Sequence, residues 1–270
     1  MRDSTDSIDR RTAIRTLLAS SAIALAGCND SSSIAQSNPL TNVSVTDTTL
    51  VVEFDADASI DEITVIQPDG EAFASRSVTS GSSKVTIDIG TQYSPGEYTV
   101  HALDGEETTG ERTLTLSPDV QITDLKLGRN HPDEMYEDAN VLAVQAETIL
   151  TVENTGTGPN SVTQLLFEGD VPQPTNKDTD KSWIYDTSSG VGGDVDRIVI
   201  PPGESTTIYS TSRPFTAASS NVSCSSDGEE GQFTAIVRLE IGKTLRQQYD
   251  VEYTGQELVD CNITVSGAEQ

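Results

Sequence analysis

The chain has few of the side chains on which most enzyme sites depend. Its 270 residues include two histidines, three cysteines and one tryptophan. His101 falls in a predicted strand and His131 in a polar loop, and no G-x-S-x-G motif indicates a nucleophile beside either. Gly242-Lys243-Thr244 is not a phosphate-binding loop, because the position that requires glycine is Val237 and no helix is predicted to follow. We therefore expect no enzymatic activity and no cofactor.

Lysine is scarce as well, and the charge is strongly of one sign. Only five lysines occur, and 43 acidic residues face 16 basic ones, which gives a formal net charge of -27. Such a surface repels nucleic acid and anionic headgroups, so no nucleic-acid partner is expected. The acid excess, the few lysines and the many Ser and Thr residues resemble the proteins of haloarchaea. This halophilic resemblance implies a chain that loses structure in dilute buffer and keeps it in molar salt, where the Debye length is about 3 Å.

Long apolar runs are missing too, but a short one near the start predicts export. Arg10 and Arg11 precede a mildly apolar run, residues 17–26, which is too short to span a bilayer and suits a signal peptide. The paired arginines resemble a twin-arginine (Tat) signal, without the phenylalanine that this family prefers after the pair. Residues 25–28, Leu-Ala-Gly-Cys, then resemble a lipobox. Together they imply a signal peptide over 1–27 and a lipid on Cys28.

The segment after Cys28 is polar and predicts a disordered tether over residues 28–41. The resemblance therefore implies an extracytoplasmic lipoprotein anchored to the outer face of the cell membrane. One lipid modification alone anchors only marginally, so stable attachment takes two chains or a second signal. The alternative is an amphipathic N-terminal helix with a chance cysteine, which leaves the small residues before Cys28 unexplained.

Residues 42–117 show the period of two that is typical of strands. Apolar residues alternate in about seven short segments, separated by turn signals such as Pro68-Asp69-Gly70. This pattern predicts an immunoglobulin-like sandwich. Residues 95–100, PGEYTV, resemble the turn into the penultimate strand of bacterial and archaeal Ig-like or fibronectin III-like domains. That resemblance implies that Tyr98 bonds back to the chain at the corner, and it implies no shared chemistry.

Residues 118–270 predict a second, larger sandwich. A strand is expected over 141–153, and residues 150–162, LTVENTGTGPNSV, resemble the strand-turn-strand of CARDB-like surface domains. The strongest alternation lies at 233–241 and returns at 245–253, with Gly242-Lys243 suited to a two-residue type II′ turn. The expected fold class is therefore all-β, with two tandem Ig-like antiparallel β-sandwiches after the signal and the tether.

Apart from Cys28, the only cysteines are Cys224 and Cys261. In an exported protein, two remaining cysteines most simply form one disulfide. Such a bridge would tie the last strand to the loop before Phe233. The alternative is two free thiols or half of a metal site, which the small number of histidines makes the poorer explanation.

An aperiodic insert over residues 169–195 interrupts the second sandwich. It is longer than ordinary loops, and such segments are often functional or disordered. It contains the only tryptophan in the run Trp183-Ile184-Tyr185. Trp183 and Tyr185 either pin the insert onto the sandwich or serve as aromatic contacts for a partner or a glycan.

Acidic clusters recur along the chain, and the cluster near the junction of the two modules is the preferred candidate for calcium, which takes six to eight oxygen ligands. It consists of Asp133, Glu134, Glu137 and Asp138. No cluster has the spacing of an EF-hand. The alternative is a solvated halophilic surface, since clusters arise by chance in a chain this acidic.

Sequons for N-glycosylation occur at four positions, which are candidate glycan sites on an exported chain. They are Asn29, Asn42, Asn221 and Asn262.

Taken together, the sequence predicts a non-catalytic cell-surface lipoprotein that acts as an interaction, adhesion or envelope-structural module. Its expected partners are the membrane, through the N-terminal lipid, and an envelope protein or a glycan. The alternative is a ligand-binding accessory lipoprotein of a transporter or a redox system, which would need a concave pocket.

Overall fold

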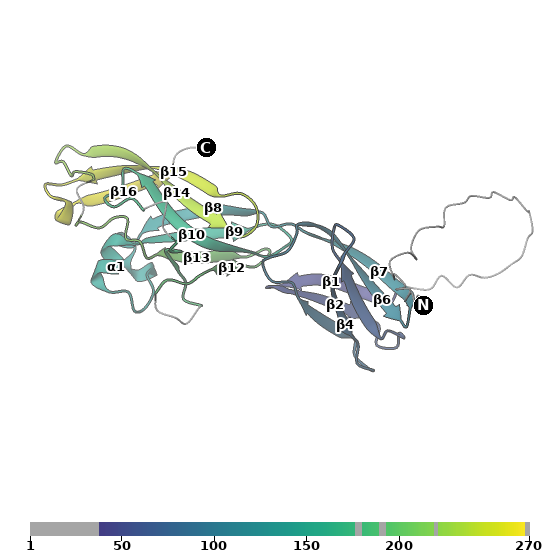
Figure 1. The fold of residues 1–270 in the computed structure, drawn as a ribbon. Helices are drawn as coiled ribbons and strands as arrows, with labels where there is room; N and C mark the ends of the chain where they lie inside the picture. The colour runs from purple at the N-terminus through teal and green to yellow at the C-terminus, as the bar shows by residue number, and fades with distance from the viewer. Residues whose placement is uncertain (1–37, 176–179, 189–192, 219–220, 268–270) are drawn as a thin grey trace, which may run out of the picture. The chain divides into compact units, whose positions relative to one another are not determined.

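The computed structural model describes residues 38–175, 180–188, 193–218 and 221–267, and these residues form antiparallel β-sandwiches (Figure 1). The signal and lipobox residues, including Arg10, Arg11, Cys28 and Asn29, lie outside the described residues, as does the tether up to residue 37. The predicted end of the tether at residue 41 is wrong, because strand β1 (Leu40–Thr46) already begins at Leu40, which is fully buried in the first core. In the described ranges, no helix is long and apolar enough to cross a membrane. The predicted all-β fold class is confirmed.

The first sandwich contains seven strands in two sheets, with the orders β1-β2-β5 and β4-β3-β6-β7. This is the strand arrangement of a fibronectin type III domain, one of the Ig-like sandwiches. The strands are β1 (Leu40–Thr46), β2 (Thr49–Phe54), β3 (Glu62–Ile66), β4 (Ala72–Ser77), β5 (Lys84–Asp88), β6 (Gly96–Asp104) and β7 (Glu107–Leu116).

The core of the first sandwich follows from the period of two along its strands. In β6, Tyr98, Val100 and Ala102 are fully buried, whereas the residues between them are not. The Tyr98 hydroxyl donates a hydrogen bond of 2.9 Å to the carbonyl of Ser94. The bond back to the chain that the PGEYTV motif implies is therefore present.

The second sandwich has sheets with the orders β11-β13-β9-β8 and β12-β10-β14-β15-β16. Their inner faces bury a common core that includes Leu150, Phe167, Phe233 and Tyr253. The strands are β8 (Val120–Leu127), β9 (Thr148–Asn154), β10 (Asn160–Gly169), β11 (Ile184–Tyr185), β12 (Ile198–Ile200), β13 (Ser205–Ser210), β14 (Glu229–Leu239), β15 (Leu245–Thr254) and β16 (Asn262–Gly267).

The strand expected over 141–153 is wrong in its first half. Residues Val141–Ala146 form the helix α1, and only Thr148–Asn154 form strand β9. The cause is local, because the side chain of Asn140 accepts hydrogen bonds from the backbone N–H groups of Leu142 and Ala143. An Asn at this position caps a helix and satisfies N–H groups that would otherwise lack partners.

The two-residue turn at Gly242-Lys243 is also wrong. Strand β14 ends at Leu239 and β15 begins at Leu245, so a five-residue loop joins them. The backbone N–H of Glu240 bonds to the carbonyl of Ser161, and that of Ile241 bonds to the side chain of Asn160. These bonds draw the end of β14 toward β10 and away from β15, which opens the turn.

The predicted disulfide is confirmed. Cys224 and Cys261 are joined by an S–S bond of 2.06 Å across a sequence separation of 37 residues. The bridge ties the segment between β13 and β14 to the start of β16, next to a short 3-10 helix, η2 (Leu258–Asp260).

Candidate functional site

Large apolar side chains are exposed at one place on the second sandwich. Among the described residues, the large hydrophobic residues recorded as exposed are Val141, Leu142 and Val259, at 70%, 62% and 66% exposure. The first two begin α1 and the third lies in η2. In a chain with a net charge of -27, three such side chains on neighbouring elements mark a candidate contact surface.

The structure of α1 explains why its first residues face outward. Ala143 and Ala146 are buried, and they are three residues apart, so they lie on one face of the helix. Val141, Leu142 and Gln145 are exposed to solvent. The helix comes close to the end of β8 because residue 128 is glycine: a Cβ there would lie 2.8 Å from the backbone oxygen of Val144 in α1.

Between α1 and η2 lies a hollow of about 550 Å³, which we name the α1–η2 pocket. Val141 and Val144 of α1 and Val259 of η2 contribute apolar side chains to its walls, and Gln145, Asp260 and Arg129 contribute polar ones. Ligand sites typically combine the two kinds of lining. The lining residues are Arg129, Asn130, Ala139, Val141, Val144, Gln145, Val259, Asp260, Cys261 and Asn262.

Arg129 connects the elements around this pocket. Its Nε and Nη2 atoms donate to the carbonyl of Gln145 at 2.9 and 2.8 Å, and Nη1 donates to the carbonyl of Cys261 at 3.0 Å. Nη2 also reaches the carbonyl of Phe215 at 3.4 Å. Because the guanidinium is partly buried, its pKa lies below the usual value for arginine.

The η2 side of the pocket is fixed by further bonds. The side-chain amide of Asn130 donates to the carbonyl of Ile263 at 2.8 Å. The disulfide holds Cys261 from the other side. Val259 is therefore displayed on a short segment whose ends are anchored, so less conformational entropy is lost when a partner covers it.

Behind α1, three tyrosines form a second, smaller core. The ring of Tyr136 lies 4.8 Å from that of Tyr185 and 5.1 Å from that of Tyr209. The hydroxyl of Tyr136 donates to the Glu147 carboxylate at 3.1 Å, and Arg213 lies 3.6 Å from the other oxygen. Burial raises the pKa of Glu147 and raises that of Tyr136 to about 12. These contacts hold α1 in place.

Tyr185 belongs to this tyrosine core, through which the insert is attached. Strand β11 adds the insert to the edge of β13, pairing Ile184 with Ser210 and Tyr185 with Tyr209. Trp183 is only partly buried, with a φ of 57° and the Lys181 ammonium 4.7 Å from its ring. Its indole N–H is buried without a hydrogen-bond partner among the described residues. A direct role of Trp183 or Tyr185 in partner contact stays a prediction.

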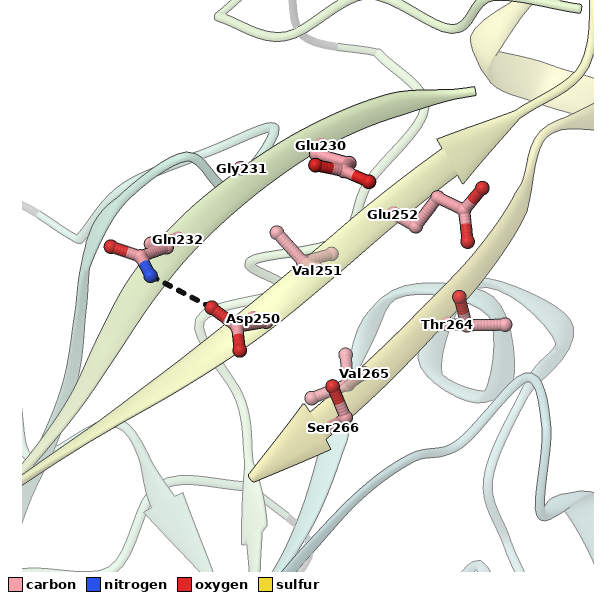
Figure 2. A pocket seen from close by; sticks show the side chains of 9 residues that line it. All are labelled: Glu230, Gly231, Gln232, Asp250, Val251, Glu252, Thr264, Val265 and Ser266. Atoms are coloured by element: carbon pink, nitrogen blue, oxygen red, sulfur yellow. Dashed lines mark hydrogen bonds between the residues drawn. The ribbon is translucent and has the colours of Figure 1, made fainter. Parts of the chain in front are cut away.

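A polar groove lies on β14, β15 and β16, over about 610 Å³ (Figure 2). Glu230 and Glu252 stand directly opposite each other in the strand register, and the Gln232 amide donates to Asp250 at 2.8 Å. Opposed like charges destabilise a strand pair, less so in high salt. Val251 and Val265 also line the groove, but neither is an exposed hydrophobic residue, unlike Val141 and Val259 of the α1–η2 pocket.

The residues of the predicted calcium cluster are exposed. Glu134 accepts a hydrogen bond from Nζ of Lys126 at 2.7 Å and lies 3.1 Å from Nδ1 of His131. The hydrogen bond from Lys126 lowers the pKa of Glu134. Asp133, Glu137 and Asp138 are exposed around it. Within the described part of the chain, no group of three or more His, Cys, Asp or Glu residues is arranged to hold a metal ion.

The three described sequons differ in what their asparagines contact. The amide of Asn42 donates to Glu53 at 3.3 Å, and that of Asn221 to the carbonyl of Val171 at 2.8 Å. Asn262 is exposed and lines the α1–η2 pocket.

The two histidines lie apart in the fold: His101 on β6 is 3.7 Å from Glu111, and His131 precedes a 3-10 turn.

Sequence reasoning missed the α1–η2 pocket. The apolar residues Val141 and Leu142 were compatible with a buried strand. The segment that forms η2 shows neither the hydrophobic period of a strand nor that of a helix. The one usable signal is Asn140 before VLAVQA, since an N-cap residue followed by helix-forming residues indicates a helix start.

The chain matches no family model, and no curated protein matches it. Solved structures align with it only loosely. A two-domain fibronectin type III segment of chicken tenascin is 13% identical over 86% of this chain and 98% of that one, with a TM-score of 0.25. The human OSCAR ligand-binding domain is 9% identical over 83% and 92%, with a TM-score of 0.21.

A glycosyl hydrolase family 2 member from Bacteroides cellulosilyticus is 10% identical, with a TM-score of 0.23. The alignment covers 74% of this chain but 24% of that enzyme, so the chain spans about a quarter of the enzyme's length. Because all three scores are this low, the fold assignment here stands on the sheet order itself.

Proposed function

We propose that this protein is a non-catalytic, lipid-anchored module of the cell exterior that holds a partner protein through the α1–η2 pocket. The export and anchoring part of the proposal is supported by the signal and lipobox patterns that end at Cys28. The binding part is supported by one observation above all: the exposed side chains of Val141 and Val259 line a single hollow, and the exposed Leu142 follows Val141 in α1.

The apolar side chains give a measure of the available binding energy. Fully burying a Val or Leu side chain contributes roughly 1.5–3 kcal/mol, so covering the exposed two thirds of three of them contributes about 3–6 kcal/mol. Association itself costs at least about 4 kcal/mol in lost rotation and translation. The apolar contacts alone therefore give weak binding, and a stable complex needs polar contacts as well.

The partner proposed is a protein and not the membrane. The pocket is bordered by Asp260 and Glu257, and Glu137 and Asp138 lie just before α1; these four carboxylates have no cation within ion-pair distance in the described ranges. Carboxylates at a loop tip oppose insertion among anionic headgroups. A protein surface with its own apolar side chains has no such conflict.

Site-specific photo-crosslinking on intact cells tests the proposal. A photoreactive amino acid replaces Leu142 in one variant and Ser266, on the polar groove, in a control variant. Both positions are exposed, so both variants should fold normally. We expect position 142, and not position 266, to give a discrete crosslinked protein. A lipid adduct at position 142, or the same products from both positions, would contradict the proposal.

A further inference from the structure

Arg129 is a cation without a countercharge. Among the residues that the structure describes, no carboxylate lies within ion-pair distance of its guanidinium, and its hydrogen bonds all go to backbone carbonyls. The chain as a whole has 43 acidic residues and 16 Lys and Arg residues, so an unpaired arginine is the exception. A partly buried charge without a partner is costly, and an anion in the pocket would relieve that cost.

The guanidinium also has bonding capacity left. It carries five N–H groups. The four bonds above use one on Nε, one on Nη1 and both on Nη2. The remaining N–H is on Nη1, the atom that bonds to the carbonyl of Cys261, two residues beyond Val259. An uncommitted charged donor and an apolar wall therefore meet within one pocket.

From this pairing we propose that the α1–η2 pocket binds the C-terminal residue of a partner chain, where that residue has a branched aliphatic side chain. The free carboxylate accepts from Nη1 of Arg129, and the side chain covers Val141 and Val259. A C-terminal residue carries both groups on one Cα, which suits a donor and an apolar wall this close together. This inference rests on the proposed function and names the chemistry of its partner.

Asp260 narrows the choice of ligand. It also lines the pocket, is exposed and has no cation partner in the described ranges. Its charge opposes an anion, so a segment with several carboxylates is repelled more strongly than a chain end with one. Removing this charge should strengthen the binding of a ligand with one carboxylate and leave the affinity of a neutral ligand unchanged. This difference between the two ligands can be measured.

The test uses defined probes and the full protein in high salt. The probes are the peptide acetyl-Gly-Ser-Val-Leu with a free carboxylate, the same peptide ending in an amide, and hexanoate. Binding is followed by titration with NMR of isotopically labelled protein. For a peptide of this size at an open site, we expect a dissociation constant on the order of millimolar. The free acid should bind about tenfold more tightly than the amide, as expected for one charge-assisted hydrogen bond.

Two variants separate electrostatics from folding. Asp260→Asn, whose side chain makes no hydrogen bond among the described contacts, should tighten binding of the acid about twofold and leave the amide unchanged. Arg129→Gln removes the charge, and it should remove the preference for the acid. If Arg129→Gln fails to fold, the acid-amide comparison and Asp260→Asn still decide the question.

Equal binding of acid and amide would overturn the inference, as would hexanoate binding as tightly as the free-acid peptide, which would indicate a lipid-like acid. If no probe binds while position 142 still crosslinks to a protein, the chain-end inference fails and the proposed function stands. If crosslinking fails as well, both fail.

Discussion

Removing the Cys224–Cys261 disulfide tests how the pocket is held in place, because Cys261 is the only lining residue that the change alters. The double variant Cys224→Ala/Cys261→Ala deletes the bond that anchors one end of the η2 segment. Cys261 itself is buried and contributes its carbonyl to Arg129, a contact that the variant keeps. Any effect therefore arises mainly from the lost covalent tie.

The magnitude follows from the length of the closed loop. For the separation of 37 residues, the chain-entropy model gives about 4 kcal/mol of stabilisation. In a domain of about 150 residues, 1 kcal/mol shifts the melting temperature by roughly 2–4 °C, so the variant should melt about 8–16 °C lower. Most of the loss should come from the less restricted unfolded chain.

The assay is thermal unfolding followed by tryptophan fluorescence at constant high salt. Trp183 is the only tryptophan and belongs to the second sandwich, so its signal reports the unfolding of that part alone. The wild-type protein treated with a reductant is the matched control. A shift below about 3 °C would refute the reasoning. It would mean that the Ser225–Thr254 bridge and the Arg129 bonds already hold the segment without the disulfide.

Three further predictions follow from single residues. Cys28→Ser should release the protein from cells into the medium, as measured by immunoblotting of both fractions, and retention of the variant on cells would contradict the lipobox interpretation. Tyr98→Phe should lower the free energy of unfolding of the first sandwich by about 1 kcal/mol, since it removes the bond to Ser94, and an unchanged denaturation midpoint would show that this bond contributes nothing. Burial raises the pKa of Glu147 in the folded chain above its ordinary value of 4.5. The protonated carboxyl therefore contributes to the free energy of unfolding below pH 4.5, and this contribution is lost as the pH rises through the folded pKa. Relative to Glu147→Gln, urea denaturation should therefore find the wild type less stable at pH 7 than at pH 4, and a constant difference would contradict the burial argument.

Much of the fold could be predicted because strand signals are local. The alternation in β6 and β14 places their buried residues directly, and the PGEYTV motif places the Tyr98 hydrogen bond. Apart from Cys28, the two cysteines allow one pairing. These features depend on neighbouring residues or on a simple count, both of which a single sequence provides.

Other features depend on contacts between distant segments. The loop at Gly242 is opened by bonds to Asn160 and Ser161, some eighty residues earlier, which no turn rule includes. A six-residue helix such as α1 is too short for its period to stand out from that of a strand. Without the helix, the exposure of Val141 and Leu142 could not be foreseen.

The pocket itself is assembled from three separate parts of the chain. Arg129 follows β8, α1 comes more than ten residues later, and η2 lies near the C-terminus. In sequence, Arg129 is one basic residue in a polar stretch, and nothing near it shows that its partners will be carbonyls of Gln145 and Cys261. Only the fold brings the unpaired charge and the apolar side chains together.

The most direct test of the central claim is the affinity of the crosslinked partner, once purified, for two matched triple variants. One carries Val141→Ser, Leu142→Gln and Val259→Ser. The other carries Glu230→Gln, Asp250→Asn and Glu252→Gln on the groove of Figure 2. The proposal predicts that the first variant binds about a hundredfold more weakly than the wild type, and that the second binds like the wild type. Equal affinity of the first variant and the wild type would contradict a role of the α1–η2 pocket in binding.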